Sequence, residues 1–316
     1  MNRSARILAL AAVLVVIGLG AFWILTLPVV VQASALPPHR PDLDNGKVMF
    51  AIGGCASCHA VSDRNPDKID RSRLGGGLAL YSAFGTFYAP NISSDTKDGI
   101  GNWTEANFVT AMWKGTSERD TNLYPTFPYT SYRLMLLDDV RDLFAYLRTL
   151  PAVAGKSHRH ELEFPFNERR LVGGWKLLFL GSGPYASDQT RSAQWNRGAY
   201  LVNGPGHCAE CHSPRNALGG IIDGERFAGG LSLDGKGWVP NITGLGHPMQ
   251  GGAAWTEKDL AHFFEDGMTP SGDVAGDEMA DVIRNTAQLS AADRAAMAVY
   301  IASLPPVTGP RPPPKK

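Results

Sequence analysis

The chain has 316 residues and carries 30 basic and 30 acidic side chains, so its formal net charge is zero. This charge balance argues against the strongly basic surface of a nucleic-acid-binding protein, and we expect no nucleic-acid partner. The length suits an N-terminal targeting or membrane segment followed by two domains of modest size.

A short basic start and a long uncharged stretch open the chain. Arg3 and Arg6 precede residues 7–31, which carry no charge. This run is longer than the usual signal-peptide core of about 7 to 15 residues and long enough for a membrane helix, which needs about 20. We interpret residues 1–35 as a membrane anchor with a cytoplasmic N-terminus. An A-x-A sequence at residues 33–35 leaves a cleaved signal open as the alternative. In either case, Leu36 onward leaves the cytoplasm.

All four cysteines lie in two copies of one motif. Residues 55–59 read CASCH and residues 208–212 read CAECH. Cysteines three positions apart lie on one face of a helical turn, as thioether bonds to both vinyl groups of one haem require, and the next histidine can bind the iron. C-x-x-C-H is the attachment signature of a c-type haem. The predicted binding residues for two covalently attached haem c groups are Cys55, Cys58, His59, Cys208, Cys211 and His212.

Three other uses of these cysteines explain less of the pattern. A thioredoxin-like redox pair needs neither the histidine nor a second copy. A zinc site could use C-x-x-C twice, but it does not explain a histidine at the same place in both copies. Structural disulfides remain open for an exported chain. Haem attachment to thiols is expected on the outer face of a bacterial-type inner membrane.

An internal repeat relates the two motifs. The GGL sequence at residues 76–78 returns at residues 229–231, and further landmarks return in the same order at a nearly constant offset. Such self-similarity indicates a duplicated domain. The predicted organisation is a first domain at residues 42–151, a linker at residues 152–189, a second domain at residues 190–306 and a proline-rich basic tail at residues 307–316.

Each copy has the same predicted helical layout. A short helix leads into the motif, a glycine-rich loop follows, a capping residue opens the next helix, and proline stops the last one. Strand signals are weak throughout, so we expect two small all-α domains packed around haem. The predicted helices include residues 45–52, 195–202, 138–150 and 291–304, with Thr104, Thr256 and Ser290 as N-caps.

This layout resembles the class I cytochrome c fold. The chain also resembles the diheme or multiheme cytochrome c subunits of membrane-bound bacterial dehydrogenases for alcohols, gluconate and fructose. The resemblance covers nearly all of residues 42–306 and rests on APNIS at 89–93, LYPTFPY at 123–129, FPFN at 164–167 and RGAYLV at 197–202. Many of those subunits carry three haems, whereas this chain has two attachment motifs and an N-terminal membrane segment. The expected fold is all-α, with two tandem class I cytochrome c-like domains behind a transmembrane helix.

Methionine opposite histidine is the usual axial pairing in cytochromes c and raises the reduction potential. In the second copy, Met279 precedes the last helix in what we expect to be a loop and matches the motif of these subunits, while Met268 competes with it. We predict His212 and Met279 as the ligands of the second iron.

The first copy is less regular. Equal spacing from the preceding glycine leads to Phe127, where some of the similar subunits have methionine. The nearest candidate is Met135, and we predict His59 and Met135 as the ligands of the first iron. Met112, a ligand other than methionine, or an open iron remain alternatives, and Met135 is then a core residue.

The resemblance implies an electron-transfer protein with no catalytic residue of its own. It would be a membrane-anchored diheme cytochrome c in a periplasmic respiratory chain, taking electrons from a partner dehydrogenase to quinone or to a cytochrome or terminal oxidase. The expected location is the bacterial inner membrane, with the haem domains in the periplasm. The alternative is a diheme enzyme, peroxidase-like or thiosulfate dehydrogenase-like, with one open or unusual iron. The second type commonly uses a cysteine ligand, but all four cysteines here belong to the attachment motifs.

Overall fold

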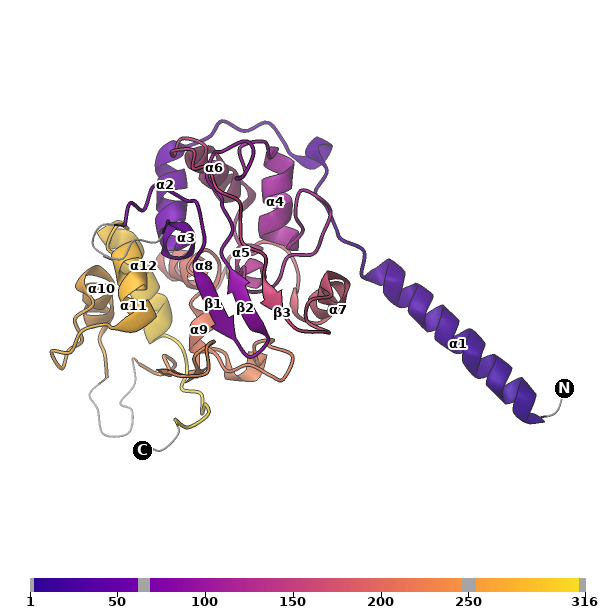
Figure 1. Ribbon diagram of the computed structural model, residues 1–316. Coiled ribbons are helices and arrows are strands. Elements are labelled where there is room, and N and C mark those ends of the chain that lie inside the picture. The colour runs from indigo at the N-terminus through magenta and orange to yellow at the C-terminus, as the bar shows by residue number, and fades with distance from the viewer. Residues whose placement is uncertain (1–2, 62–68, 246–253, 313–316) are drawn as a thin grey trace.

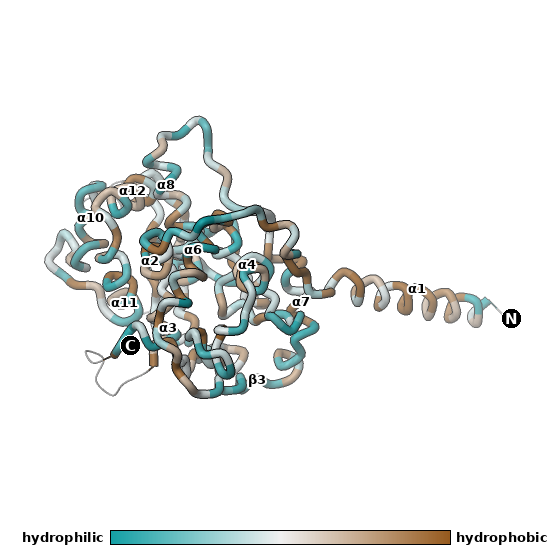
Figure 2. The backbone as a smooth tube through the Cα atoms, turned by 90° about the horizontal axis from the view of Figure 1, so that it is seen from above, coloured by the Kyte–Doolittle hydropathy of each residue, from teal (hydrophilic) through white to brown (hydrophobic). Residues whose placement is uncertain are grey.

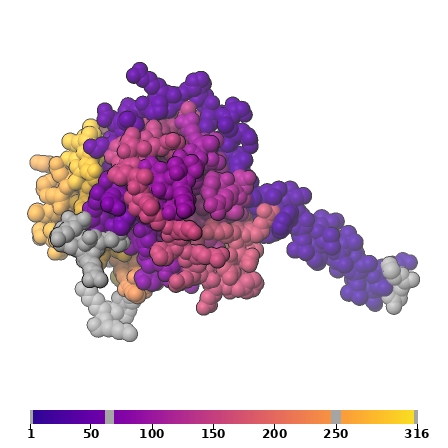
Figure 3. Space-filling view, turned by 45° about the horizontal axis from the view of Figure 1, so that its top comes forward, coloured from indigo at the N-terminus to yellow at the C-terminus, as the bar shows by residue number. Residues whose placement is uncertain are grey.

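The structure is a computed structural model that describes residues 3–61, 69–245 and 254–312. A single helix, α1 (Arg3–Leu25), projects from the body of the molecule (Figure 1). None of its described residues is buried, and the helix is long and apolar enough to cross a membrane by length and composition. Hydrophobic residues follow one another along most of its length (Figure 2), and it stands clear of the body in the space-filling view (Figure 3).

The segment between α1 and the body lies along one side of the first half, which we define as residues 42–151. Its backbone is fixed at several points. The amide of Val31 donates to Thr110 Oγ1 at 2.9 Å, and Arg141 donates to the carbonyl oxygen of Pro37 at 2.7 Å. The segment contains one 3₁₀ turn, η1 (Ala33–Ala35).

The first half is mainly helical. Its opening helix is capped by Asp42, whose carboxylate accepts from two backbone amides of the first turn. Two of its strands form an antiparallel hairpin to which a third strand adds from the segment after the half. The elements are α2 (Leu43–Ile52), α3 (Cys55–His59), β1 (Ala79–Ser82), β2 (Gly85–Tyr88), α4 (Glu105–Lys114), α5 (Tyr129–Tyr132), α6 (Leu137–Leu147) and β3 (Glu161–Leu162).

The second half, residues 190–306, contains a similar series of helices. One helix, α7, comes before it, in the segment where the sequence predicts only a linker. The elements are α7 (Arg169–Phe179), α8 (Ala193–Asn203), α9 (Ala209–His212), η3 (Asp223–Glu225), β4 (Gly230–Leu231), β5 (Trp238–Val239), α10 (Glu257–Asp266), α11 (Asp277–Thr286) and α12 (Ala291–Ala302).

The predicted N-caps are confirmed. Thr104 and Thr256 each form a capping box with the third helical residue, and the Ser290 hydroxyl accepts from the amide of Asp293. The last helix of each half ends before its predicted end, at Leu147 and Ala302. The residue before a proline is disfavoured in the α conformation, so the chain leaves the helix ahead of the proline. The expectation of a mainly helical fold is confirmed, with short strands in addition.

In each half, the helix before the motif packs against the last helix, α2 on α6 and α8 on α12. A glycine allows each close crossing. A Cβ at Gly46 would overlap the carbonyl of Asp142, and one at Gly198 would overlap that of Ala296. The largest cluster of buried apolar side chains runs without interruption through both halves, so the two halves share a continuous core. Of the predicted tail, residues 307–312 form neither helix nor strand, and residues 313–316 lie outside the described part of the chain.

Candidate functional site

Each attachment motif begins at a turn in left-handed backbone conformation. Gly54, the N-cap of α3, has a φ of 61°. At the matching position of the second half, His207 has a φ of 39°. Left-handed φ values are easy for glycine and uncommon for other residues. Both turns follow a long helix and reverse the chain into the short helical segment of the motif.

Both motif histidines are oriented by the same kind of hydrogen bond. The Nδ1 atom of His59 lies 2.8 Å from the carbonyl oxygen of Pro90, and that of His212 lies 2.9 Å from the carbonyl oxygen of Pro240. Because a carbonyl can only accept, each Nδ1 must carry the proton. The Nε2 lone pair is then free to bind a metal, as in metal sites where a backbone carbonyl fixes the tautomer. Burial lowers the pKa of both imidazoles, which keeps them neutral.

The glycine-rich loops after the motifs also hydrogen-bond to the backbone of the motif histidines. The amides of Gly76 and Gly229 each donate to the carbonyl oxygen of the motif histidine at 2.8 Å. Both glycines have positive φ, and a Cβ at either one would overlap the backbone of the Pro-Asn-Ile loop. The repeated sequence landmarks are therefore the residues that orient the two histidines.

The four cysteines are free thiols, of which Cys55, Cys58 and Cys208 are partly buried and Cys211 is exposed. Burial raises the pKa of Cys55 and Cys208 to about 12 and that of Cys58 to about 11. A thioredoxin-like or zinc-binding cysteine needs a stabilised thiolate, and these surroundings disfavour one. In the described part of the chain, no group of three or more His, Cys, Asp or Glu side chains could hold a metal ion. The geometry therefore fits thioether attachment to haem better than the alternatives.

Met135 is fully buried between α5 and α6, and its backbone carbonyl oxygen accepts from Trp113 Nε1 at 3.0 Å. It directly precedes Leu136, the N-cap of the last helix. In the second half the residue at this place, before the N-cap Ser290, is the buried Leu289. Met135 thus lies at a position that has an apolar core residue in the second half.

Met279 lies in α11 and is partly buried. Our expectation of a loop at this position was wrong, because the helix already begins at Asp277. The competing Met268 is 47% exposed and forms an isolated bridge with Val274, as Thr116 does with Asn122 in the first half. By this correspondence, Met279 occupies the position in the second half that Phe127 occupies in the first.

The two motifs contact the opposite halves of the molecule through the same motif position. Ser57, the third residue of CASCH, accepts from Asn285 Nδ2 of α11 at 3.0 Å. Glu210, the third residue of CAECH, accepts from Thr130 at 2.7 Å and from Ser131 at 2.9 Å, both in α5. The thiols are close enough that Cys211 contributes, after burial, to the raised pKa of Cys58. The two motifs therefore lie on facing surfaces.

Sequence reasoning missed Glu210. Burial alone would raise the pKa of its carboxyl, but Arg215 Nη2 at 2.7 Å and the two hydroxyl donors outweigh burial and hold that pKa below its usual range. The buried carboxylate is therefore charged and paired. The sequence signal was present, because an acidic residue stands in the second motif where the first has serine.

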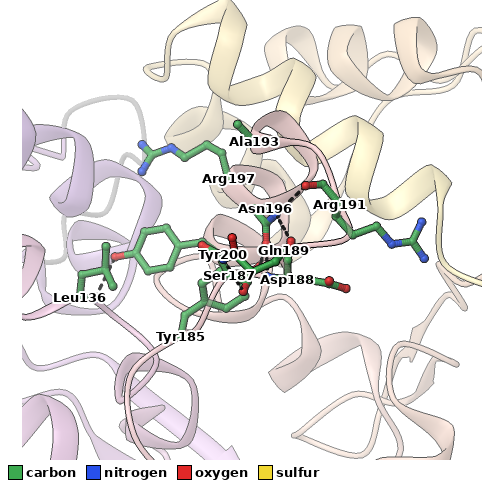
Figure 4. A pocket seen from close by; sticks show the side chains of 10 residues that line it. All are labelled: Leu136, Tyr185, Ser187, Asp188, Gln189, Arg191, Ala193, Asn196, Arg197 and Tyr200. Carbon is green, nitrogen blue, oxygen red and sulfur yellow. Dashed lines mark hydrogen bonds between the residues drawn. The ribbon is translucent and has the colours of Figure 1, made fainter.

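A separate pocket of about 420 Å³ lies between α8 and the segment that precedes it (Figure 4). The side-chain oxygen of Asn196 accepts from the Tyr185 hydroxyl at 2.8 Å and from the Asp188 amide at 2.7 Å. The hydroxyl of Tyr200 reaches toward Leu136 and donates to Asp139. No motif cysteine or histidine lines this pocket. Its polar groups hold the segment that contains Tyr185 and Asp188 against α8, and they lie apart from the two C-x-x-C-H motifs.

Comparisons with known proteins agree with this geometry. The Cytochrome c family matches residues 43–151. The chain is 42% identical, over 97% of its own length and all of the relative's, to a diheme cytochrome c-type protein of Cereibacter sphaeroides. It is 36% identical over 84% of its length to the fructose dehydrogenase cytochrome subunit of Gluconobacter japonicus, of which it spans 53%. It is also 32% identical over 85% of its length to the cytochrome c subunit of the quinone-dependent alcohol dehydrogenase of Gluconobacter oxydans, of which it spans 57%.

Proposed function

Because the chain belongs to the family of c-type cytochromes, we propose that it is a membrane-anchored carrier that passes single electrons between two covalently bound haems. The observation that carries this proposal is the doubled site. Two C-x-x-C-H motifs hold their histidines in the same way and face each other across the two halves. The matching elements support two tandem class I cytochrome c-like domains at residues 42–151 and 190–306.

The haem supplies one-electron redox chemistry when it is bound. The chain itself attaches, orients and shields the group. Cys55 and Cys58, and likewise Cys208 and Cys211, would form the thioether bonds, and the following histidine would present Nε2 to the iron. The hydrogen bond from Nδ1 to a proline carbonyl oxygen makes the imidazole a stronger ligand. A buried environment excludes water and helps set the reduction potential.

Facing motifs suit electron transfer between the haems. Contacts at Ser57 and Glu210 hold each motif against a helix of the other half, so the relative position of the motifs does not depend on the linker alone. The contact of Ser131 with Glu210 is buried, and those of Thr130 and Asn285 are partly buried. An electron entering at one haem can then leave from the other.

Partner and location follow from relatives and from α1. Several relatives are named as cytochrome subunits of dehydrogenases, including ones for fructose, alcohol and gluconate. We propose that a periplasmic or membrane-bound dehydrogenase donates electrons, and that quinone or a cytochrome or terminal oxidase accepts them. The helix α1 would anchor the chain in a bacterial inner membrane, with its N-terminus in the cytoplasm and the haem domains in the periplasm.

We further propose Met279 and Met135 as the second axial ligands. Met279 lies in α11, before the last helix of its half, and is partly exposed to solvent. Met135 is the first-half methionine nearest the corresponding region, and its burial keeps water from the thioether sulfur.

One observation favours a second candidate function. Phe127, which matches Met279 in the repeat, cannot bind iron, and Met135 matches a core leucine. If Met135 serves only as a core residue, the first iron has an open position or a different ligand. A diheme enzyme of the peroxidase type would use such an iron to bind its substrate.

The absorption spectrum of the oxidised, haem-loaded chain tests both proposals. Methionine-ligated ferric haem has a sulfur-to-iron band near ~695 nm, in keeping with the role of methionine as an axial ligand. We expect Met135→Ala and Met279→Ala each to remove about half of this band, with the exposed Met268→Ala as the matched control that keeps all of it. An unchanged band in Met135→Ala would reject methionine ligation of the first iron and favour the enzyme.

A further inference from the structure

Helix α7 presents an apolar face to the outside of the molecule. Leu171, Leu177 and Leu178 are 45%, 57% and 68% exposed. Val172 and Gly173 on its inner side are buried. Leucines on one side and packed residues on the other are the pattern of an amphipathic helix, but here the apolar side faces outward. A water-exposed face of this kind requires a partner.

Contacts on the inner side hold α7 firmly to both halves. The ammonium group of Lys176 donates to the carbonyl oxygens of Lys114 and Gly115 at 2.7 and 3.1 Å, at the C-terminal end of α4. Trp175 Nε1 donates to the carbonyl oxygen of Leu218 at 2.9 Å, in the second half. Lys176 lies on the same side of α7 as the buried Val172 and Gly173, so its hydrogen bonds fix the rotation of the helix and leave the leucines outward.

The same helix packs against the end of α1. A Cβ at Gly173 would overlap Thr26, and one at Gly174 would meet the ring of Phe22 at 3.0 Å. The guanidinium of Arg170 lies 4.1 Å from the centre of the Trp23 ring. Figures 1 and 2 both show α7 beside the point where α1 leaves the body. A membrane-crossing α1 would emerge from the bilayer at this level.

We propose that the outer face of α7 lies in the outer interface of the membrane that α1 crosses, with its leucines among the upper acyl chains. This inference rests on the proposed membrane anchor. Helices with an apolar face and basic flanks bind in the interfacial plane, and Trp and Arg are favoured at this depth. At the start of α7, Arg170 donates to the carbonyl oxygen of Trp23 and stacks on its ring, so a cation lies where α1 leaves the body. Phe164, in the turn before the helix, is 78% exposed.

The lipid contact gives the haem domains a fixed orientation. Without it, the body would be tied to α1 only through the segment before α2 and the contacts of α7 with α1. With α7 seated in the interface and bound to both halves, the two motifs keep a constant distance and angle to the membrane. A membrane-bound electron donor or acceptor would then always approach the haem domains from the same side.

Lipid photolabelling of the full haem-loaded chain tests the proposal. The chain is reconstituted in vesicles of phosphatidylethanolamine and phosphatidylglycerol that contain a trace of phosphatidylcholine with a diazirine on its acyl chain. After irradiation and proteolysis, mass spectrometry locates the lipid adducts. We expect adducts in α1 and on Leu171, Leu177 and Leu178. Adducts confined to α1 would overturn the role of α7 and leave the anchor intact.

Two variants sharpen the result. Combined Leu171→Asn, Leu177→Asn and Leu178→Asn should lose the α7 adducts and keep those in α1. The matched control is Val274→Asn, an exposed apolar residue between α10 and α11, which should keep both sets. An unchanged haem spectrum checks that the variants fold. Absence of adducts in α1 of the unmodified chain would instead refute the membrane anchor, and thereby that part of the proposed function.

Discussion

At the scale of single residues, the motif histidines and the buried Glu210 differ in how they could be recognised. The histidines follow from the C-x-x-C-H spacing, and the proline loops that orient them follow from the repeat. Glu210 follows from neither, because its importance comes from Thr130 and Ser131 in the other half. The structural role of this carboxylate can be recognised only when the fold shows that the two hydroxyls donate to it.

Replacement of Glu210 tests the value of this pairing. We expect Glu210→Ala to lower the free energy of unfolding by about 2 to 3 kcal/mol, because it removes the carboxylate partner of the partly buried Arg215 and of the Thr130 and Ser131 hydroxyls. Glu210→Gln keeps the shape and some hydrogen bonds and should cost less. Denaturant unfolding followed by haem absorbance measures both. A loss below about 0.5 kcal/mol in Glu210→Ala, the size of ordinary surface changes, would contradict a structural role.

At the scale of elements, the main helices and their caps could be predicted, whereas α7 could not. The capping sequences of α4, α10 and α12 are local signals, and the chain uses them as predicted. Helix α7 exposes leucines that a soluble domain would bury, so its sequence pattern does not predict which of its faces packs against the body. The expectation of a loop at Met279 was also wrong, since no side-chain cap marks where α11 begins.

Lys176 provides a pH test of how α7 is attached. Burial and, to a lesser extent, Lys114 lower the pKa of its ammonium group to about 8 from 10.5. Between these two values the unfolded chain binds the proton and the folded chain does not, so the contribution of Lys176 to the free energy of unfolding rises with pH. We expect Lys176→Met to remove this rise, as seen in denaturant midpoints measured from pH 8 to 10.5. Exposed Lys258→Met is the control, and an equal rise in all three proteins would exclude Lys176 as its source.

At the scale of the whole molecule, the facing motifs depend on a small set of polar contacts. Arg71 forms an ion pair with Asp281 at 3.3 Å and donates to Ser57 at 3.1 Å, while Asn285 donates to the same hydroxyl. These residues come from both halves and surround the first motif.

Removal of Asn285 should loosen this junction. We expect Asn285→Ala to lower the free energy of unfolding by about 0.5 to 1.5 kcal/mol, because it removes the hydrogen bonds of a buried amide with Ser57 and Arg71. The two halves should then unfold less cooperatively, and electron exchange between the haems should slow. Equilibrium unfolding and rapid-reaction spectroscopy measure these effects. Gln288→Ala, an exposed amide just after α11, is the matched control. Unchanged unfolding and unchanged exchange would show that Asn285 does not hold the halves together.

The sequence by itself determined the two C-x-x-C-H motifs, the repeat, the main helices and the candidate membrane segment. Each of these depends on spacing, composition or a local cap, which neighbouring residues specify. Only the tertiary structure decided that the two motifs face each other, that Glu210 is a buried charged link, and that α7 lies against α1 with its leucines outward. These features arise from residues far apart in the chain, whose approach depends on how the whole core packs.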